Sequence, residues 1–418
     1  METSARPAPG GRIALALLLA INLFNFIDRY VLAAVEPEIR AHFFSANDPN
    51  AHFSTGKLGA AFLVSYMISA PIFGWLADRF ARWLIIGISV ILWSAATAAS
   101  GLAGTFAFLL AMRLFVGVGE GGYGPAAPTI IADLFPVSIR GRVMSYFYVA
   151  IPVGSAIGYA IGGFVASHWG WQTAFFVVAP PGLLLGLVCF WQREPHRSDK
   201  VEKKRATWQD YVGLLRTPSY VLNTLAMTAL TFAIGGMSFW VPGYLEFRGL
   251  PPASRIVFGG ILVFGGLTAT LSGGLAGDYF RKRFSGSYFL VSGIGVMFAF
   301  PFSVLMLFMP FPAAWAMMFL AIFFLFFNTG PSNTALANVT HPSVRSTAFA
   351  LNILIIHALG DASAPPLIGF VADRTNMNIA FLVVSAMMLV AGIFWLWAAK
   401  FLAADTEAIE STTSPASA

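Results

Sequence analysis

The sequence is poor in charged residues and has almost no cysteine. Only 11% of its 418 residues are Asp, Glu, Lys or Arg, whereas a soluble domain carries about 25%. This excludes a water-soluble globule of this size, because too little polar surface remains to cover it. The single cysteine, Cys189, excludes a disulfide framework and a cysteine-based metal site. We therefore expect no metal and no cofactor other than protons as a coupling ion.

Hydrophobic residues are abundant and form runs long enough to cross a bilayer. They make up 57% of the chain, and residues 83–112, 143–192, 217–245, 284–344 and 375–399 contain no Asp, Glu, Lys or Arg. A transmembrane helix needs about 20 apolar residues, so the longest runs each hold two helices. We predict an all-α integral membrane protein with spans at 13–36, 57–78, 83–103, 105–133, 140–166, 171–192, 218–245, 256–278, 284–308, 313–338, 345–371 and 379–401.

Two motifs occur twice along the chain. Gly74-Trp-Leu-Ala-Asp78 returns as Gly274-Leu-Ala-Gly-Asp278, and Gly163-Phe-Val-Ala-Ser167 returns as Gly369-Phe-Val-Ala-Asp373. A duplicated half with an even number of spans predicts two parallel six-helix bundles around a central site. The predicted domains are an N-terminal bundle over 1–192, a cytoplasmic basic linker over 193–217, a C-terminal bundle over 218–402 and a disordered tail over 403–418.

The basic residues indicate the orientation in the membrane. Most of the 25 Lys and Arg fall on one side of the predicted topology, which is cytoplasmic by the positive-inside rule. Both termini are then cytoplasmic, and the net charge of +6 needs no nucleic-acid partner. We expect a monomeric, multi-pass protein of the plasma membrane, or of the inner membrane if the source is bacterial, whose partners are the bilayer and an amphipathic substrate.

Spans 1 and 4 contain charged residues, which are expensive in a bilayer and usually face a cavity or one another. Asn25 and Arg29 share a face of span 1, whereas Asp28 points about 100° away, toward a different neighbour. Arg113 and Glu120 lie near one line on span 4. We expect Gly117 and Gly124, on the same face, to leave space for something bulky. The corresponding positions of the second half are uncharged, so this chemistry belongs to the first half.

These charges suggest proton coupling. A carboxylate buried in a cavity has a raised pKa and can take up a proton near neutral pH, and a neighbouring arginine lowers that pKa until a substrate occupies the arginine. We hypothesise that Asp28 and Glu120 are the protonatable pair and that Arg29 is the substrate-binding or switching partner, with Asn25 and Arg113 beside it. The alternative is a static salt bridge that holds spans 1 and 4 together.

Further candidates lie on spans 5 and 11. His357 and Asp361 share a face, and histidine titrates near neutral pH, so they are expected to relay a proton or bind a headgroup, or else to form a structural pair. On span 5, Gly154, Gly158 and Gly162 have the spacing of close helix packing. The neighbouring face carries polar tips and rings that either line a substrate pocket or pack, namely Tyr148, Ser155 and Tyr159.

The loop between spans 2 and 3 carries a recognisable pattern. Gly74-x-x-x-Asp78-Arg79-x-x-Arg82, together with Arg113-Leu-Phe-Val-Gly117-Val-Gly-Glu120 in span 4 and twelve spans in parallel halves, resembles the major facilitator superfamily. The resemblance implies a cytoplasmic latch, in which an acid contacts arginines and a helix end in one conformational state and separates from them in the other. The alternative is a simple tight turn whose basic residues only set the membrane topology. Tyr279 replaces the arginine in the second half, where the latch should be weaker. The latch residues would be Gly74, Asp78, Arg79, Arg82, Arg140, Arg142 and Asp278.

A narrower resemblance concerns spans 1, 4, 5 and 11. Several segments are similar to segments of the spinster branch of that superfamily. The spinster branch, in turn, is similar to carriers of lysophospholipids and sphingoid lipids. The resemblance also implies a switching role for Arg29. The segments are Asn25-Phe-Ile-Asp28-Arg29-Tyr30, Gly117-Val-Gly-Glu120, Ala127-Pro-Thr-Ile-Ile-Ala-Asp133-Leu-Phe135, Ala150-Ile-Pro-Val-Gly-Ser155 and His357-Ala-Leu-Gly-Asp361.

The two halves differ in polarity, which bears on the cargo. The charges of spans 1 and 4 would face a second half rich in phenylalanine, including Phe323, Phe324, Phe326 and Phe327, unless those rings face lipid. A cavity that is polar on one side and apolar on the other suits a charged head with a hydrocarbon tail. The sequence thus favours a proton-coupled carrier of lysolipid or sphingoid-type amphiphiles, working by alternating access. The alternatives are a symporter of small organic anions and a non-transporting lipid sensor; an enzyme is not expected.

Overall fold

The computed structural model describes residues 9–195, 208–284, 286–341 and 344–413. In these ranges the regular structure is helical, and twelve helices are long and apolar enough to cross a membrane. This confirms the twelve predicted spans to within a few residues at most ends; the second begins at Ala51 rather than at residue 57. The cytoplasmic placement of the termini stays a prediction.

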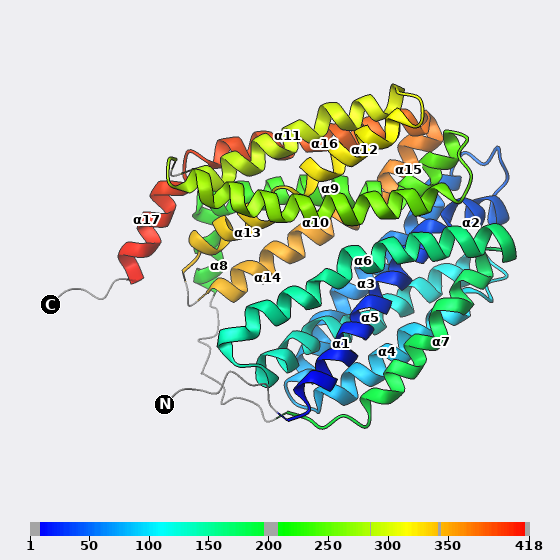
Figure 1. Ribbon diagram of the computed structural model, residues 1–418, viewed down its shortest axis with the longest axis horizontal. Coiled ribbons are helices and arrows are strands. Elements are labelled where there is room, and N and C mark those ends of the chain that lie inside the picture. Colours follow the sequence, from blue (N-terminus) through cyan, green and yellow to red (C-terminus); the bar gives the residue numbers. More distant parts are fainter. Residues whose placement is uncertain (1–8, 196–207, 285, 342–343, 414–418) are drawn as a thin grey trace. The chain divides into compact units, whose positions relative to one another are not determined.

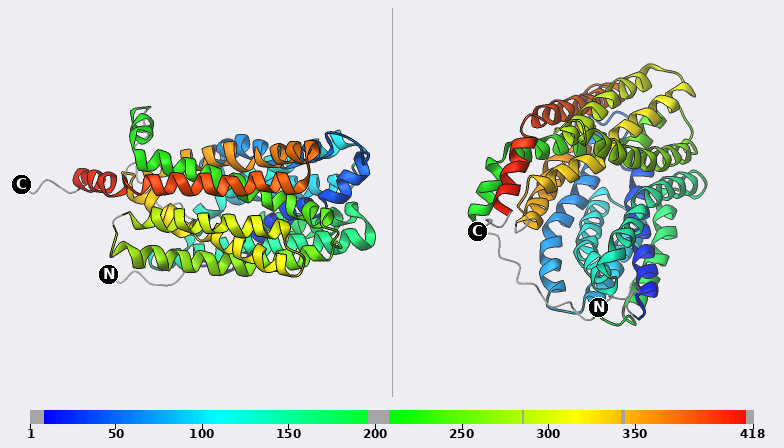
Figure 2. Two further views of the ribbon diagram at one scale, coloured as in Figure 1. Left: turned by 90° about the horizontal axis from the view of Figure 1, so that it is seen from above. Right: turned by 60° about the vertical axis from the view of Figure 1, so that its left-hand side comes forward.

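The chain divides into two compact units, and the first contains the N-terminal bundle. Unit 1 comprises Met1–Lys200, Ser238–Gly260 and Pro365–Arg374. Within it α3 packs against α5, α1 against α6, and α4 against both α5 and α7, and these long helices run side by side in Figures 1 and 2. Its helices are α1 (Gly11–Ala34), α2 (Glu36–Phe43), α3 (Ala51–Ala77), α4 (Arg82–Ser100), α5 (Phe106–Leu134), α6 (Val137–Trp169) and α7 (Trp171–Cys189).

Unit 2 comprises Val201–Met237, Ile261–Ala364 and Thr375–Ala418. Its helix α11 packs against α12, α13 and α16. The units do not coincide with the sequence halves, because Ser238–Gly260 of α9 and α10 and Pro365–Arg374 of α15 pack in unit 1. The remaining helices are α8 (Trp208–Arg216), α9 (Pro218–Phe247), α10 (Ser254–Arg281), α11 (Ser287–Phe308), α12 (Ala313–Phe326), α13 (Thr329–Asn338), α14 (Arg345–Ile356), the π-helix η1 (His357–Asp361), α15 (Ala364–Arg374), α16 (Met377–Ala398) and α17 (Leu402–Thr413).

Glycines on α6 allow it to touch α1 closely, as the four-residue spacing predicts. A Cβ added at Gly154 would lie 2.7 Å from the Cβ of Phe26, one at Gly158 would lie 2.7 Å from the Ile27 carbonyl oxygen, and one at Gly162 would lie 2.5 Å from the Cβ of Ala34. Because lipid offers no hydrophobic force between helices, such close packing carries much of their association. It fixes the position of α1, which bears the charged residues.

The tail differs from the prediction. Residues Leu402–Thr413 form α17, although the Ser, Thr and Ala content predicted disorder from residue 403. The Asp405 side chain accepts a hydrogen bond of 2.9 Å from the backbone N–H of Ser219, in the first turn of α9. A carboxylate at a helix N-terminus is favourable. The amino-acid composition of the tail could not reveal this contact, because the two residues lie far apart in the sequence. Part of the predicted linker also forms a helix, α8, while 196–207 lie outside the described residues.

The close packing of α4 and α5 can be tested by adding one methyl group. A Cβ at Gly119 would lie 2.7 Å from the backbone N of Trp93, so we expect Gly119→Ala to destabilise the protein by about 1–3 kcal/mol. Thermal unfolding in detergent should show a Tm lower by several degrees, about 2–4 °C per kcal/mol. Gly260→Ala in α10 is the control, because nothing lies within 4 Å of its added Cβ. An unchanged Tm for Gly119→Ala would contradict the packing.

Candidate functional site

The charged residues of spans 1 and 4 meet inside unit 1. Arg29 of α1 donates through Nε to Oε2 of Glu120 on α5, at 2.6 Å. The Glu120 side chain is fully buried, whereas 24% of the Arg29 side chain is exposed. A buried ion pair is favourable only when its geometry is good and its remaining polar atoms are satisfied. The pair therefore combines a buried acid with an arginine whose side chain is still partly exposed.

Three aromatic rings lie around Arg29, and one of them also contacts Arg113. The Cζ of Arg29 lies 5.1 Å from the ring centre of Phe26, 4.8 Å from that of Phe62 and 5.3 Å from that of Tyr66. Phe62 also contacts Arg113, whose Cζ lies 5.3 Å from the same ring. Ring faces attract cations, the more so when water is excluded. The sequence analysis missed Phe62 and Tyr66 because nothing in the apolar run of span 2 marks these two rings.

Asp28 lies on the other side of α1, as predicted. Its Oδ2 accepts a 2.7 Å hydrogen bond from Oγ1 of Thr97 on α4, while Oδ1 has no hydrogen-bond partner among the described residues. Arg113 is 1% exposed and interacts electrostatically with both Asp28 and Glu120. The cluster thus contains two basic and two acidic side chains, whose formal charges sum to zero.

Several buried polar atoms of this cluster lack partners in the described part of the chain. These are Nε and Nη1 of Arg113, Oε1 of Glu120 and Nδ2 of Asn25. Asn22, by contrast, donates to the Phe147 carbonyl at 2.7 Å and ties α1 to α6. An unsatisfied buried polar group costs about 1–3 kcal/mol and calls for an explanation. The cluster is therefore an incompletely satisfied polar site.

The expectation about Gly117 and Gly124 is wrong. They do not leave space for a bulky group, because α3 fills that space. A Cβ at Gly117 would collide with the carbonyl oxygen of Phe62 and the hydroxyl of Ser65, and one at Gly124 would lie 2.8 Å from the hydroxyl of Tyr66. A sequence shows that a residue is small, but not which helix lies against it.

Of the three predicted lining residues of α6, two are occupied by protein contacts. The Tyr159 hydroxyl donates to the Ser238 carbonyl, and its ring packs on Tyr30 and Phe258. The Ser155 hydroxyl donates to the Ile151 carbonyl of its own helix at 2.7 Å. Only Tyr148 presents most of its surface, being 54% exposed. Substrate contact by these residues stays a prediction, and Tyr148 is the best placed for it.

His357 and Asp361 pair within η1 of unit 2. The His357 Nδ1 lies 3.0 Å from both carboxylate oxygens of Asp361. A π-helical turn within a span is rare and is often found at functional sites. Gly235 of α9 makes room for this turn, since its added Cβ would lie 2.5 Å from that of Asp361. These two residues belong to unit 2, whereas the four-charge cluster belongs to unit 1.

Three of the phenylalanines expected to face the cavity, Phe323, Phe324 and Phe327, pack against other aromatic rings. Phe324 stacks on Phe302 with ring centres 5.7 Å apart and lies 5.5 Å from Phe298, both on α11. Phe323 and Phe327 pack against Phe324 in turn. These rings therefore join α12 to α11.

Two of the predicted latch residues, Arg79 and Arg82, make contacts within the first half of the sequence. Arg82 pairs with Asp133 and with Glu194, each at 2.7 Å, two acids that the sequence analysis did not assign to the latch. Asp78 follows the last residue of α3, and Gly74 lies one turn before it. Arg79 lies over the Trp75 ring at 3.9 Å. The side chains of Arg140 and Arg142 lie outside the described residues.

In the second-half counterpart of the latch loop, Asp278 has a neutral hydrogen-bond donor. The Tyr288 hydroxyl donates to Oδ1 of Asp278 at 3.0 Å, and Arg281 approaches that hydroxyl at 3.5 Å. A neutral donor gives a weaker hydrogen bond than a charged one. The weaker second latch expected from Tyr279 and the latch function of either loop stay predictions.

A layer of ion pairs that the sequence analysis missed lies on α2. Arg40 pairs with Glu36 at 3.2 Å and with Glu246 of α9 at 2.9 Å. Burial lowers the pKa of Arg40, but the two carboxylates outweigh burial and hold that pKa above its ordinary value. Arg40 therefore stays charged. These residues lie in loops or at helix ends, where charge is ordinary, so no sequence signal distinguishes them.

Comparison with known proteins agrees with this architecture. The family model of the Major Facilitator Superfamily matches residues 18–364. The chain is similar to Protein spinster homolog 1 of Xenopus laevis (32% identity over 437 residues, 95% of this chain and 82% of that protein). It is also similar to the sphingosine-1-phosphate transporter SPNS2 of Xenopus tropicalis (32% identity over 434 residues, 95% and 83%).

Two solved structures share the fold. One is the crystal structure of a bacterial homolog to the human lysosomal transporter Spinster, in an inward-facing and unoccupied conformation (TM-score 0.79, 22% identity, 98% of this chain and 99% of that chain). The other is a D-xylose-proton symporter (TM-score 0.74, 18% identity, 92% and 96%). At these identities the likeness concerns the fold alone.

The Arg29–Glu120 pair can be tested by a double-mutant cycle. Removing one member of a buried pair costs about 3–5 kcal/mol, because the other charge is left uncompensated. We therefore expect Glu120→Gln to lower the Tm in detergent more than Arg29→Gln/Glu120→Gln does. The exposed acid Glu407 supplies the control variant, Glu407→Gln, which should leave the Tm unchanged. Strictly additive effects of the two single substitutions would show that the side chains do not interact.

Proposed function

The chain belongs to the spinster branch of the major facilitator superfamily and is a membrane transporter, and we propose that it carries amphipathic lipids of the lysophospholipid or sphingoid type, coupled to protons. The proposed cycle is alternating access, in which a central site opens to one side of the membrane and then to the other. Asp28 and Glu120 would take the proton, and Arg29 would bind the anionic headgroup.

The observation that carries the proposal is the contact between Arg29 and buried Glu120. A proton on Glu120 removes its charge and leaves the guanidinium without its counter-ion. An anionic headgroup at Arg29 supplies a new counter-ion and leaves the carboxylate without its cation, which favours a proton there. Each event thus lowers the cost of the other, and this reciprocity is what couples two ligands.

The surroundings of Arg29 support a phosphate or carboxylate headgroup. Its side chain is the most accessible of the four charges, and the guanidinium can bind such groups with two parallel hydrogen bonds. Arg113 and Asn25 offer further N–H donors that have no partner among the described residues. A relative of this chain is named a sphingosine-1-phosphate transporter, and that cargo combines an anionic headgroup with a hydrocarbon tail.

The proposed cargo can be tested with purified protein in liposomes under an imposed pH gradient. Labelled sphingosine-1-phosphate and a lysophospholipid should accumulate faster than in protein-free liposomes, and dissipating the gradient with a protonophore should abolish the accumulation. Small carboxylates serve as competitors. If carboxylates are accumulated and lysolipids neither move nor compete, the cargo is a small organic anion. If lipids bind without moving, the protein is a sensor.

Proton coupling can be tested with charge-neutral variants. We expect Asp28→Asn and Glu120→Gln each to reduce gradient-driven accumulation at least about tenfold, which corresponds to 1.4 kcal/mol. Exchange of labelled for unlabelled lipid without a gradient should survive, because it needs no net proton transfer. Glu407→Gln is the matched control. A folded Asp28→Asn/Glu120→Gln variant that still accumulates lipid at the normal rate would refute the coupling.

A further inference from the structure

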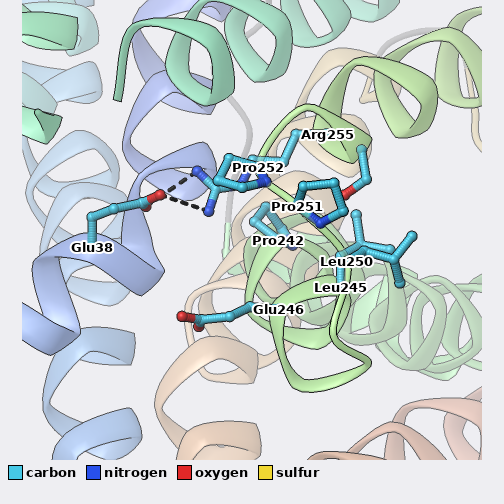
Figure 3. Close-up of a pocket in the computed structure, with 9 residues that line it drawn as sticks. Glu38, Pro242, Leu245, Glu246, Leu250, Pro251, Pro252 and Arg255 are labelled. Carbon is cyan, nitrogen blue, oxygen red and sulfur yellow. Dashed lines mark hydrogen bonds and ion pairs between the residues drawn. The ribbon is translucent and has the colours of Figure 1, made fainter. Parts of the chain in front are cut away.

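Two of the buried arginines in unit 1 are paired differently. Arg255 at the start of α10 is 3% exposed and binds Glu38 of α2 with two bonds, of 2.8 and 3.1 Å, beside the cavity drawn in Figure 3. Such two-point binding of a carboxylate is typical of a buried guanidinium. Arg113 of α5 is 1% exposed, yet its Nε and Nη1 have no hydrogen-bond partner among the described residues. The same kind of side chain thus binds a carboxylate in one place and not in the other.

A carboxylate oxygen that could accept a hydrogen bond from Arg113 is present in the same cluster. Glu120 uses Oε2 for Arg29, whereas its buried Oε1 has no partner in the described part of the chain. Arg113 and Glu120 lie on one face of α5, because seven residues make almost two complete turns. They interact electrostatically, but no ion pair joins these two described side chains. A donor and an acceptor of opposite charge thus stay unpaired, although one helix face carries both.

Phe62 of α3 packs on α5 between these two charges. Gly117 stands between Arg113 and Glu120 on the same helix face. A Cβ added at Gly117 would collide with the Phe62 carbonyl oxygen, so the absence of a side chain there is what admits the Phe62 backbone. The centre of the Phe62 ring lies 5.3 Å from Cζ of Arg113 and 4.8 Å from Cζ of Arg29. The ring therefore contacts the unpaired arginine and also the arginine that holds Glu120.

The Phe62 ring can hold Arg113 in place without a carboxylate. A ring face attracts a cation, and more strongly where water is excluded; Phe62 is 5% exposed. Because Arg29 lies near the same ring, the ring also offsets part of the repulsion between the two guanidinium groups. Protein interiors are close-packed, so no second side chain can share the volume of the ring. The ring thus obstructs the path from Arg113 to Glu120.

We propose that Phe62 is a positioning residue of the charge cluster, whose ring keeps Arg113 away from Glu120 and thereby reserves this acid for Arg29. Its importance for transport rests on the proposed function, in which Arg29 exchanges Glu120 for an anionic headgroup. If Arg113 could take the place of Arg29, Glu120 would keep a counter-ion, and headgroup binding would no longer favour a proton there. Exclusive pairing is therefore what lets cargo and proton influence each other.

Exclusive pairing can be tested by double-mutant cycles in the wild-type and Phe62→Leu backgrounds, with the Tm in detergent as the readout. The coupling is the difference between the Tm shift of the double variant and the sum of the two single shifts. For Arg113→Gln with Glu120→Gln, we expect the coupling to be larger by at least about 2 °C without the ring, because the two side chains can then meet. For Arg29→Gln with Glu120→Gln, it should fall, because Glu120 then has a second cation.

The matched control background is Phe147→Leu. Phe147 of α6 is also 5% exposed and belongs to the same hydrophobic core, but its ring packs on Tyr123 and Tyr148, so both couplings should stay as in the wild type. If Phe62→Leu does not fold, Phe62→Met replaces it with the same expectation. The proposal is overturned if the Arg113–Glu120 coupling is unchanged without the Phe62 ring, or if Phe147→Leu changes it equally. Neither result would touch the proposed lipid transport, because no cargo or gradient enters the measurement.

Discussion

Buried charge inside a bilayer must be compensated, and the arrangement of α1, α4 and α5 follows from that requirement. Arg29 meets Glu120 at 2.6 Å, and Asp28 takes a hydrogen bond from Thr97 at 2.7 Å. Arg113 then balances the second acid. Because insertion of a single charge costs several kcal/mol, each of these charges costs less beside a group of opposite sign than it would alone. The proposed proton coupling rests on this balance, which one proton or one anion would disturb.

Close helix packing sets the positions of these charges. Gly154, Gly158 and Gly162 hold α6 on α1, and Gly117 and Gly124 hold α3 on α5. Since small residues let helices approach closely without a hydrophobic driving force, the glycines are structural requirements of the site although none of them binds anything. They also bring the Phe62 ring of α3 against both arginines.

The two ends of unit 1 use charge differently. At the end that carries the predicted latch loop, Arg82 is held by Asp133 and Glu194, all from the first half of the sequence. At the end that carries α2, the contacts of Asp373 and Arg255 join residues more than 200 positions apart. The first set of contacts lies within one half of the sequence, whereas the second set joins the two halves.

Sequence reasoning was most successful for features that depend only on the order of neighbouring residues along the chain. Hydrophobic run length predicted the twelve spans, and four-residue glycine spacing predicted close helix packing at Gly154, Gly158 and Gly162, since both depend on local periodicity alone. It was wrong about the space at Gly117 and about the tail, where α17 forms with Asp405 against α9. The transport roles of Asp28, Glu120 and His357 stay predictions. Such a role concerns what a residue does during the transport cycle, and a contact in one structure does not test it.

The sequence by itself determined that the chain is a membrane protein with duplicated halves and that its first half buries charge, because composition and spacing suffice for those conclusions. Only the tertiary structure decided which partners the charges have. Arg29 with Glu120, Arg82 with Asp133 and Asp373 with the start of α3 are pairs separated by 51 to more than 300 residues. Such pairs depend on how helices are rotated and stacked, and no local pattern encodes that.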